Sequence, residues 1–175
     1  MSGAGGPPPP RPGKSLGKAL DLMRELWALD HALQSRSKAM AATIGLTGPQ
    51  RVVVRLVGRF PDIAAGSLAE LLMIHPSTLT GILQRLESRG MLERHPDPSD
   101  GRRIRLRLTP RARELDRETE GTVEMAVKRV LQRIPGGTVD SARELIDALT
   151  RELHAMAGPA AGGAPPARRR RGRPA

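Results

Sequence analysis

The sequence contains no cysteine and no tyrosine, and its aromatic residues are limited to Trp27 and Phe60. Without cysteine, the chain cannot form a disulfide, a thiolate zinc site, a cysteine nucleophile or a thiol redox sensor. The scarcity of rings argues against binding of single-stranded nucleic acid, because that mode stacks bases on aromatic side chains. No apolar run approaches the roughly 20 residues of a transmembrane helix, and the Gly/Pro-rich start lacks the apolar stretch of a secretory signal. These absences predict a cytoplasmic protein that makes no contact with a membrane.

Arrangements of residues that carry chemistry are also lacking. The histidines are scattered, without a pair at ligand spacing and without neighbouring carboxylate clusters: His31, His75, His95 and His154. No glycine-rich phosphate loop, pair of catalytic carboxylates or Ser/His/Asp arrangement is apparent. We therefore expect no metal, no cofactor and no enzymatic activity.

What the sequence does have is positive charge. It carries 29 Lys and Arg against 18 Asp and Glu, a net charge of +11, which points to a polyanionic partner and most often to nucleic acid. The charge is concentrated in two places, because residues 85–113 carry +5 and the last eight residues carry five arginines. The segment 114–167 is net acidic. Two basic foci therefore flank an acidic segment, which a uniformly basic coat would not produce.

The length of 175 residues predicts one domain with tails. Residues 1–14 are Gly/Pro-rich and residues 158–175 are low in complexity, so we expect both segments to be disordered. The remaining residues, 15–157, suffice for a single core.

The first predicted helix covers residues 15–42 and has two rows of apolar residues at helical spacing. One row contains Leu16, Leu20, Met23 and Trp27, and the other contains Leu22, Leu26, Leu29 and Leu33. Two rows exceed what packing against one neighbouring helix requires, which indicates a further partner such as a second subunit. Thr47 and Gln50 form a capping box for the next helix, which ends before Pro61. Ser67 and Glu70 form a second capping box.

Residues 67–90 predict two helices joined by a tight turn, with Gly90 ending the second. Such a pair is typical of a helix-turn-helix, although short helix pairs are common. The next segment favours DNA binding, because residues 91–95 and 103–108 form strands around a turn with Asp100 and Gly101 at its tip. A hairpin in this place is a wing. Thr109 then caps a long helix that continues to Ile134, and a last helix starts at about Thr138.

The second helix of the pair, residues 76–89, has a small polar face opposite its apolar stripe. Hydroxyl and amide groups can hydrogen-bond base edges in a major groove, and a glycine allows close approach. We predict that this face contacts DNA, the alternative being an ordinary solvated surface. The candidate residues are Ser77, Thr78, Thr80, Gly81, Gln84 and Arg85.

Arginines follow the hairpin and form the second group of candidates. Arg102, Arg103 and Arg105 can enter a narrow minor groove, which attracts arginine through its negative potential. Asp100 is better placed to hold Arg102 in a fixed pose than to face phosphates. The alternative is that the arginines form a solvated basic edge that prevents strand pairing.

These segments together resemble the MarR family of winged helix-turn-helix transcription regulators. The similarity rests on Leu46-Thr47 with Gln50, on Leu-Ala-Glu-Leu-Leu at 68–72, on the stretch from Pro76 to Arg94, and on Asp100-Gly101-Arg102 followed by Leu108-Thr109. The resemblance implies a mainly α fold with a small β-hairpin wing, a DNA-binding lobe over about 47–109, and dimerisation helices over about 15–42 and 110–157.

The resemblance further implies a homodimer that binds a pseudo-palindromic operator in double-stranded DNA, in a bacterial or archaeal cytoplasm and at the nucleoid. On the family pattern the residues of helix 76–89 given above fall at major-groove positions, and Arg102 falls at the minor-groove position. A small, often phenolic, effector would release such a repressor from DNA. We assign no effector residues, because we expect Trp27 to pack in the core and His31 to face solvent. Without cysteine, the thiol-sensing branch of the family is excluded.

The C-terminal tail departs from the family pattern. It consists of Arg168, Arg169 and Arg170 followed by Arg171, Gly172, Arg173 and Pro174, which resembles the AT-hook, a motif that lies in the minor groove of A·T-rich DNA. A nonspecific electrostatic tail is the alternative. Either form would raise DNA affinity by adding a second contact. The overall alternative to an operator-binding regulator is an architectural protein that coats DNA with little selectivity.

Overall fold

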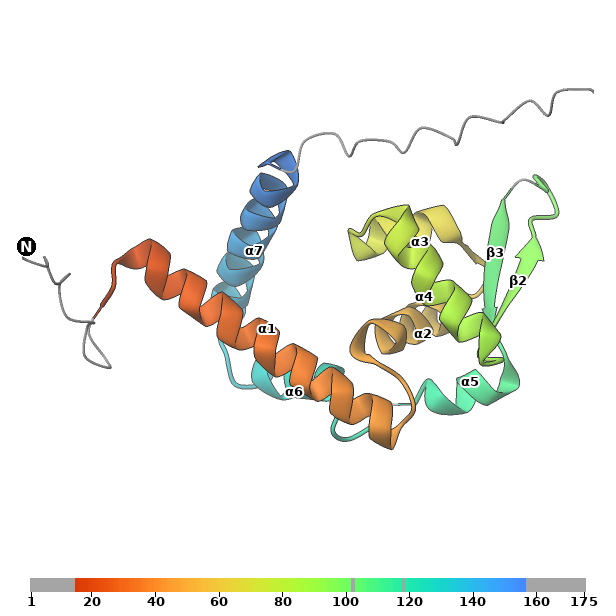
Figure 1. Cartoon of the computed structure of the whole chain (residues 1–175), viewed down its shortest axis with the longest axis horizontal. Coiled ribbons are helices and arrows are strands. Elements are labelled where there is room, and N and C mark those ends of the chain that lie inside the picture. The colour runs from red at the N-terminus through yellow and green to blue at the C-terminus, as the bar shows by residue number, and fades with distance from the viewer. Residues whose placement is uncertain (1–14, 102, 118, 157–175) are drawn as a thin grey trace, which may run out of the picture. The chain divides into compact units, whose positions relative to one another are not determined.

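The computed structural model describes residues 15–101, 103–117 and 119–156 (Figure 1). The chain divides into two compact units, one up to Lys128 and the other from Arg129. The described part is mainly helical, as predicted, with elements in the order α1 (Lys18–Thr43), α2 (Gly48–Arg59), β1 (Ile63–Ala64), α3 (Ala65–Leu72), α4 (Pro76–Ser88), β2 (Leu92–Pro96), β3 (Ile104–Leu108), α5 (Pro110–Leu115), α6 (Val123–Leu131) and α7 (Gly136–Met156).

The elements from α2 to α5 enclose one hydrophobic core, and we call them the winged lobe. Helices α2, α3 and α4 and the strands each contribute apolar side chains to it, which explains why the short α3 is stable although it has only eight residues. The most deeply buried members include Leu46, Val53, Val54, Leu68, Leu83, Leu86 and Leu106.

The sheet has the order β1-β3-β2, and both pairs are antiparallel. The predicted hairpin is confirmed, with Leu92 opposite Leu108 and Pro96 opposite Ile104. The third strand, β1, was not predicted from the sequence. It has only two residues, and Ile63 pairs with Leu106, so it could not show an alternating pattern.

Local sequence signals mark most helix ends. The capping box of α2 is present, since the Thr47 hydroxyl accepts from the Gln50 backbone and the Gln50 side chain accepts from the Thr47 backbone. Gly90 adopts a positive φ of 63°, and the backbone N–H groups of Gly90 and Met91 donate to Glu87 and Leu86. These two bonds are the Schellman arrangement that ends a helix.

The capping box predicted at Ser67 is wrong, because α3 begins earlier, with Ala64 at its N-cap and no side-chain cap. Strand β1 ends at Ala64 and leads directly into the helix at Ala65, before Ser67 is reached.

The long helix predicted from Thr109 to Ile134 is also wrong. It is broken into α5 and α6, although Thr109 does cap its start. Gly121 has φ of 74° and the Thr122 hydroxyl accepts from the Met125 backbone, so a turn and a new cap interrupt the apolar periodicity. The following helix, α7, begins at Gly136, slightly before the predicted start.

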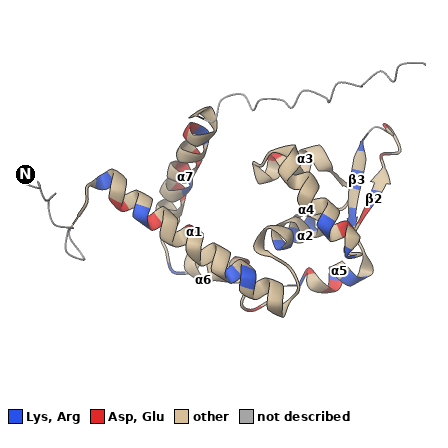
Figure 2. Ribbon diagram, viewed as in Figure 1, with Lys and Arg blue, Asp and Glu red and all other residues tan. Residues whose placement is uncertain are grey.

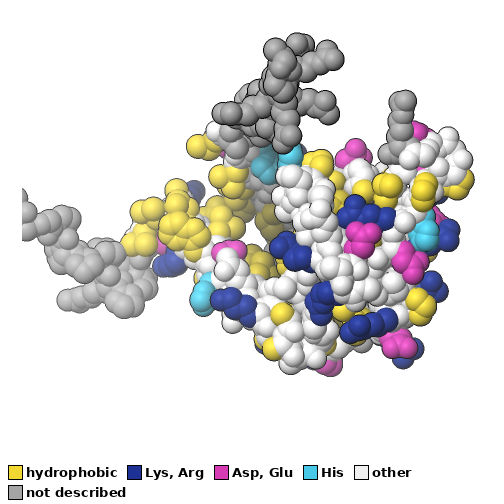
Figure 3. Space-filling view, turned by 45° about the vertical axis from the view of Figure 1, so that its right-hand side comes forward, with side chains coloured by type: hydrophobic (Ala, Val, Ile, Leu, Met, Phe, Trp, Pro, Cys, Tyr) yellow, Lys and Arg dark blue, Asp and Glu magenta, His cyan; other side chains and the backbone are white. Residues whose placement is uncertain are grey.

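Helices α1, α6 and α7 expose most of their apolar residues in the single chain. Within the described residues, α1 buries only Met40, and α6 and α7 bury none. Figure 3 shows hydrophobic side chains gathered on the N-terminal part of α1, at the left of the view. The prediction that Trp27 packs in the core is wrong, because 68% of Trp27 is exposed, whereas His31 is exposed as expected. None of the described helices is both long and apolar enough to cross a membrane.

Candidate nucleic-acid interface

Helices α3 and α4 form the predicted helix-turn-helix, and the turn between them is set by two residues. Met73 ends α3 in the left-handed region, with φ of 52°, which redirects the chain. His75 is the N-cap of α4, where its Nδ1 lies 3.3 Å from the Ser77 backbone nitrogen and 2.7 Å from the Ser77 hydroxyl. Because a backbone N–H can only donate, Nδ1 is the acceptor in its bond with the Ser77 backbone. Pro76 then occupies the first helical position.

Helix α4 buries one face and exposes the other. Leu79, Ile82, Leu83 and Leu86 are buried in the core of the lobe. The predicted contact residues lie on the outer side: Ser77, Thr78, Thr80, Gln84 and Arg85 are exposed, and Gly81 is half-buried. A methyl group built on Gly81 would lie 3.6 Å from Nη2 of Arg85, so this guanidinium lies back along the helix. The result is a row of small polar groups that a flat surface can approach closely.

The loop of the wing is held by a buried carboxylate. Asp97 is 7% exposed and accepts from the Ser99 backbone at 2.8 Å, from the Ser99 hydroxyl at 2.6 Å and from Arg105 Nε at 2.8 Å. The Ser99 bonds, followed by the Arg105 guanidinium, hold the pKa of Asp97 well below its usual range. The loop is therefore anchored at its base by an ionised side chain.

The three arginines of the wing that the structure describes between 103 and 107 are paired with carboxylates, which the sequence pattern did not reveal. Arg105 pairs with Asp97, and Arg103 lies 3.4 Å from Asp100. Arg107 pairs with Asp62 through Nε and Nη2, and these bonds lower the pKa of Asp62 and raise that of Arg107. Figure 2 shows the basic segments on β3 and the acidic ones near them.

Part of the predicted interface lies outside the described residues. Arg102, for which we predict a minor-groove contact with Asp100 as its orienting partner, lies outside them. So does the whole tail with Arg168 to Arg171, Gly172, Arg173 and Pro174. Among the described residues, no three His, Cys, Asp or Glu side chains gather as a metal site would require.

Helices α2, α3 and α4 with the hairpin define a winged helix-turn-helix domain. The MarR family model matches residues 46–104. The transcriptional repressor Rv2887 of Mycobacterium tuberculosis is 30% identical over 109 residues, which cover 62% of this chain and 78% of that protein. The chain therefore belongs to the MarR family and is a transcription regulator, as the sequence resemblance predicted; the family and the names of its relatives indicate a regulator and not an enzyme.

Solved structures agree with this assignment. The MarR transcription regulator of Oenococcus oeni is 27% identical, with a TM-score of 0.60, over 77% of this chain and 99% of that chain. FabT of Streptococcus pneumoniae, solved in complex with DNA, shares the fold with a TM-score of 0.59 at 18% identity, over 79% of this chain and 99% of that chain.

Proposed function

We propose that the chain is a homodimeric repressor that binds a pseudo-palindromic operator in double-stranded DNA. The observation that carries this proposal is the outer face of α4, where exposed hydroxyl and amide groups stand on a helix whose opposite face is fixed in the core. A rigid helix with small polar groups suits the major groove, in which each base pair presents a distinct pattern of donors and acceptors. FabT, of the same fold, is known in complex with DNA.

In this proposal the contacts divide by groove. Helix α4 binds in the major groove through Ser77, Thr78, Thr80, Gly81, Gln84 and Arg85. The wing binds the adjacent minor groove through Arg102, with Asp100 and Arg103 beside it in the loop and Arg105 on β3. Because Arg103 and Arg105 are paired with carboxylates, their part is to set the path of the loop and its local charge. Ser77 and the helix N-terminus lie where a phosphate is favoured.

The exposed apolar residues of α1, α6 and α7 support a dimer. Leu20, Leu29, Val127, Ile146 and Leu153 are each between 51% and 64% exposed, and such stripes need another surface to bury them. A second copy would present two recognition helices about one turn of DNA apart.

Replacement of Gln84 by alanine tests base recognition. Operators are first enriched from genomic fragments with the full-length chain, and affinity is then measured on the selected duplex and on single-base variants. Gln84→Ala should cost about 1–3 kcal/mol on the selected site and relax selectivity at one base pair. Gln34→Ala is the matched control, because Gln34 is exposed on α1 and bonds only Asp30. An equal loss on every sequence would show that Gln84 does not contact a base.

An architectural protein that coats DNA is the second candidate, and the net charge of +11 with its arginine-rich tail favours it. Competition between the selected duplex and random duplex at fixed salt separates the two, since coating predicts a ratio near one. Deletion of residues 168–175 should reduce the salt dependence of binding by about 0.9 for each phosphate contact that is lost. An unchanged slope would mean that the tail makes no contact.

We also propose that a small, phenolic effector releases the repressor from DNA. This part rests on the resemblance to the family alone. A panel of phenols added to the operator complex tests it, and loss of affinity on the selected duplex is the expected result. If no phenol in the panel changes the affinity, the chain has no effector of this class.

A further inference from the structure

The break between α5 and α6 leaves backbone carbonyls without their helical donors. In a continuous helix, the carbonyls of Leu115 and Arg117 would each accept a hydrogen bond from the backbone N–H four residues later. The chain instead turns through residues 116–122, of which the structure describes all except 118, and both carbonyls need other partners.

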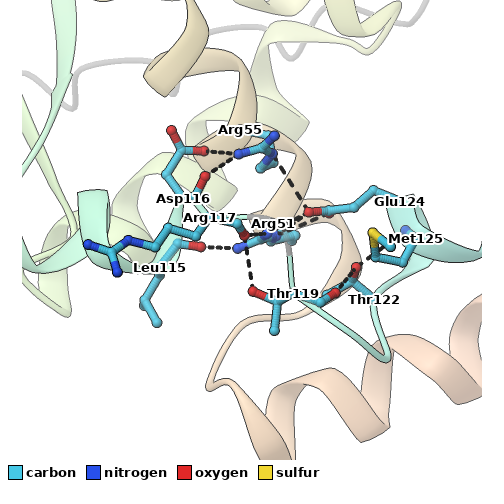
Figure 4. Close-up of polar contacts among 9 residues, drawn as sticks. All are labelled: Arg51, Arg55, Leu115, Asp116, Arg117, Thr119, Thr122, Glu124 and Met125. Carbon is cyan, nitrogen blue, oxygen red and sulfur yellow. Dashed lines mark hydrogen bonds and ion pairs between the residues drawn. The ribbon is translucent and has the colours of Figure 1, made fainter. Parts of the chain in front are cut away.

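One side chain of α2 supplies them. Arg51 is 1% exposed, its Nη1 donates to the Leu115 carbonyl, and its Nη2 donates to the Arg117 carbonyl (Figure 4). Its Nε lies 3.0 and 3.1 Å from the two carboxylate oxygens of Glu124, in the first turn of α6. A single guanidinium therefore contacts the end of α5, the turn and the start of α6.

The next turn of α2 adds a second set of contacts. Arg55 Nη1 lies 2.9 Å from Oδ1 of Asp116, and Arg55 Nε lies 3.6 Å from Oε1 of Glu124. A methyl group on Gly58 would overlap the Asp116 carboxylate, so glycine is needed for this close approach. We call Arg51, Arg55, Asp116 and Glu124 the α2 clamp.

The clamp joins the broken helix to a helix that is held in the core of the winged lobe. Helix α2 is anchored in the core by Val53, Val54 and Val57, and the same core holds α4. An apolar residue in place of Arg51 could fill space but could not satisfy two carbonyls and a carboxylate. Buried ion pairs are costly to desolvate, and their best-supported use is to specify one geometry.

We propose that the α2 clamp fixes the direction in which α6 leaves the winged lobe and thereby sets the half-site spacing that the dimer accepts. Arg51 is in this account a positioning residue that touches no DNA. The inference rests on the proposed function, dimeric operator binding. Small angles matter here, because a rotation of about 10° at a radius of about 15 Å moves α4 by about 2.6 Å, or about three quarters of the base step of about 3.4 Å.

The test compares Arg51→Lys with the parent in the full-length chain. Lysine keeps the charge but cannot bond two carbonyls and a carboxylate as a planar fork does. Affinity is measured on the selected operator, on versions with the spacer lengthened or shortened by single base pairs, and on a duplex with one half-site. Arg59→Lys is the matched control, since Arg59 lies two turns further along α2, is exposed, and lies over the Phe60 ring, away from the clamp.

For the parent and Arg59→Lys we expect affinity that peaks sharply at one spacing. Arg51→Lys should lose about tenfold at that spacing, keep its affinity for the single half-site, and show a flattened profile. A merely destabilising substitution would instead lower affinity for all duplexes in parallel. Thermal unfolding checks that Arg51→Lys is folded. If it is not, Glu124→Gln takes its place in the test, because this change removes only the charge of the carboxylate that Arg51 contacts.

The outcomes separate the two proposals. If the parent binds no duplex selectively, the proposed function fails before the clamp is tested. If the parent has a sharp profile and the variants of Arg51 and Glu124 are equally sharp, the clamp does not set spacing and this inference is wrong. A parent that binds its operator without any spacing preference also overturns it.

Discussion

The winged lobe and the helices α1, α6 and α7 use similar apolar residues in opposite ways. Leu83 in α4 is 2% exposed, whereas Leu153 in α7 is 64% exposed. The lobe closes a core with residues from α2 to α5, while the apolar stripes of the other three helices remain uncovered in one chain. The difference teaches that the part proposed to contact DNA buries its apolar residues within one chain, whereas the other helices require another surface.

The largest difference between the two regions is expected when a core leucine is replaced. Leu83→Ala removes a side chain that is surrounded on all sides, so we expect a loss of about 2–5 kcal/mol in the free energy of unfolding. Leu153→Ala is the matched change on an exposed stripe and should cost far less in the monomer. Chemical denaturation followed by circular dichroism measures both, and similar losses would contradict the division into two kinds of region.

A charged residue among the exposed apolar residues of α1 should weaken dimer formation and leave the winged lobe folded. Leu29 is 52% exposed in the single chain, so Leu29→Asp should raise the dimer dissociation constant by at least about tenfold, because burial of a leucine stabilises by about 1.5–3 kcal/mol. Analytical ultracentrifugation measures the constant, and the emission of Trp27, the only tryptophan, reports whether α1 becomes covered. A variant that dimerises like the parent would place the interface elsewhere.

The sequence could predict most of the winged lobe because its signals are local. Thr47, Gly90 and Thr109 mark helix ends through caps that depend on a few neighbours, and the alternation of β3 marks a half-buried strand. The break after Leu115 could not be predicted, since apolar periodicity continues across it and the stabilising contact comes from Arg51, 64 residues earlier in the chain. The burial of Trp27 was predicted wrongly for a related reason. An apolar stripe predicts that its residues become buried, but it does not show whether the same chain or another one covers them.

The candidate site was predictable in part for the same reason. Helical spacing alone places Gln84 and Thr80 on the outer face of α4. The partners of the wing arginines could not be predicted, because Asp62 meets Arg107 only once β1 pairs with β3. The pairing of Asp97 with Arg105 likewise depends on the register of the hairpin.

Acid should weaken the wing more than it weakens α1. The pKa of Asp97 is lowered in the folded state, so its contribution is complete above the unfolded value of about 4 and is lost as the pH falls below it. Asp97→Asn should therefore destabilise the lobe at pH 7, and the difference from the parent should shrink as the medium is acidified. Asp21→Asn is the control, since Asp21 also has a lowered pKa, but its partners are the exposed Ser15 and Leu16 before α1 and the nearby Arg24. Urea midpoints across pH that run parallel for parent and Asp97→Asn would contradict this.

The smallest effect is expected at the end of α3. Met73 has a positive φ of 52° without being glycine, so Met73→Gly should raise the free energy of unfolding by about 0.5–1 kcal/mol. Gly90→Ala, at the φ of 63° that ends α4, should lower it by a similar amount. Thermal unfolding of both variants measures the pair, and a shift of the same sign in both would contradict the backbone argument.

The central claim is that two recognition helices of one dimer bind two half-sites, and a hydroxyl-radical footprint on the selected operator tests it most directly. We predict two protected windows about one helical turn apart, at a stoichiometry of two chains to one duplex. Protection that spreads evenly along the DNA as protein is added, or a single window occupied by one chain, would contradict the account.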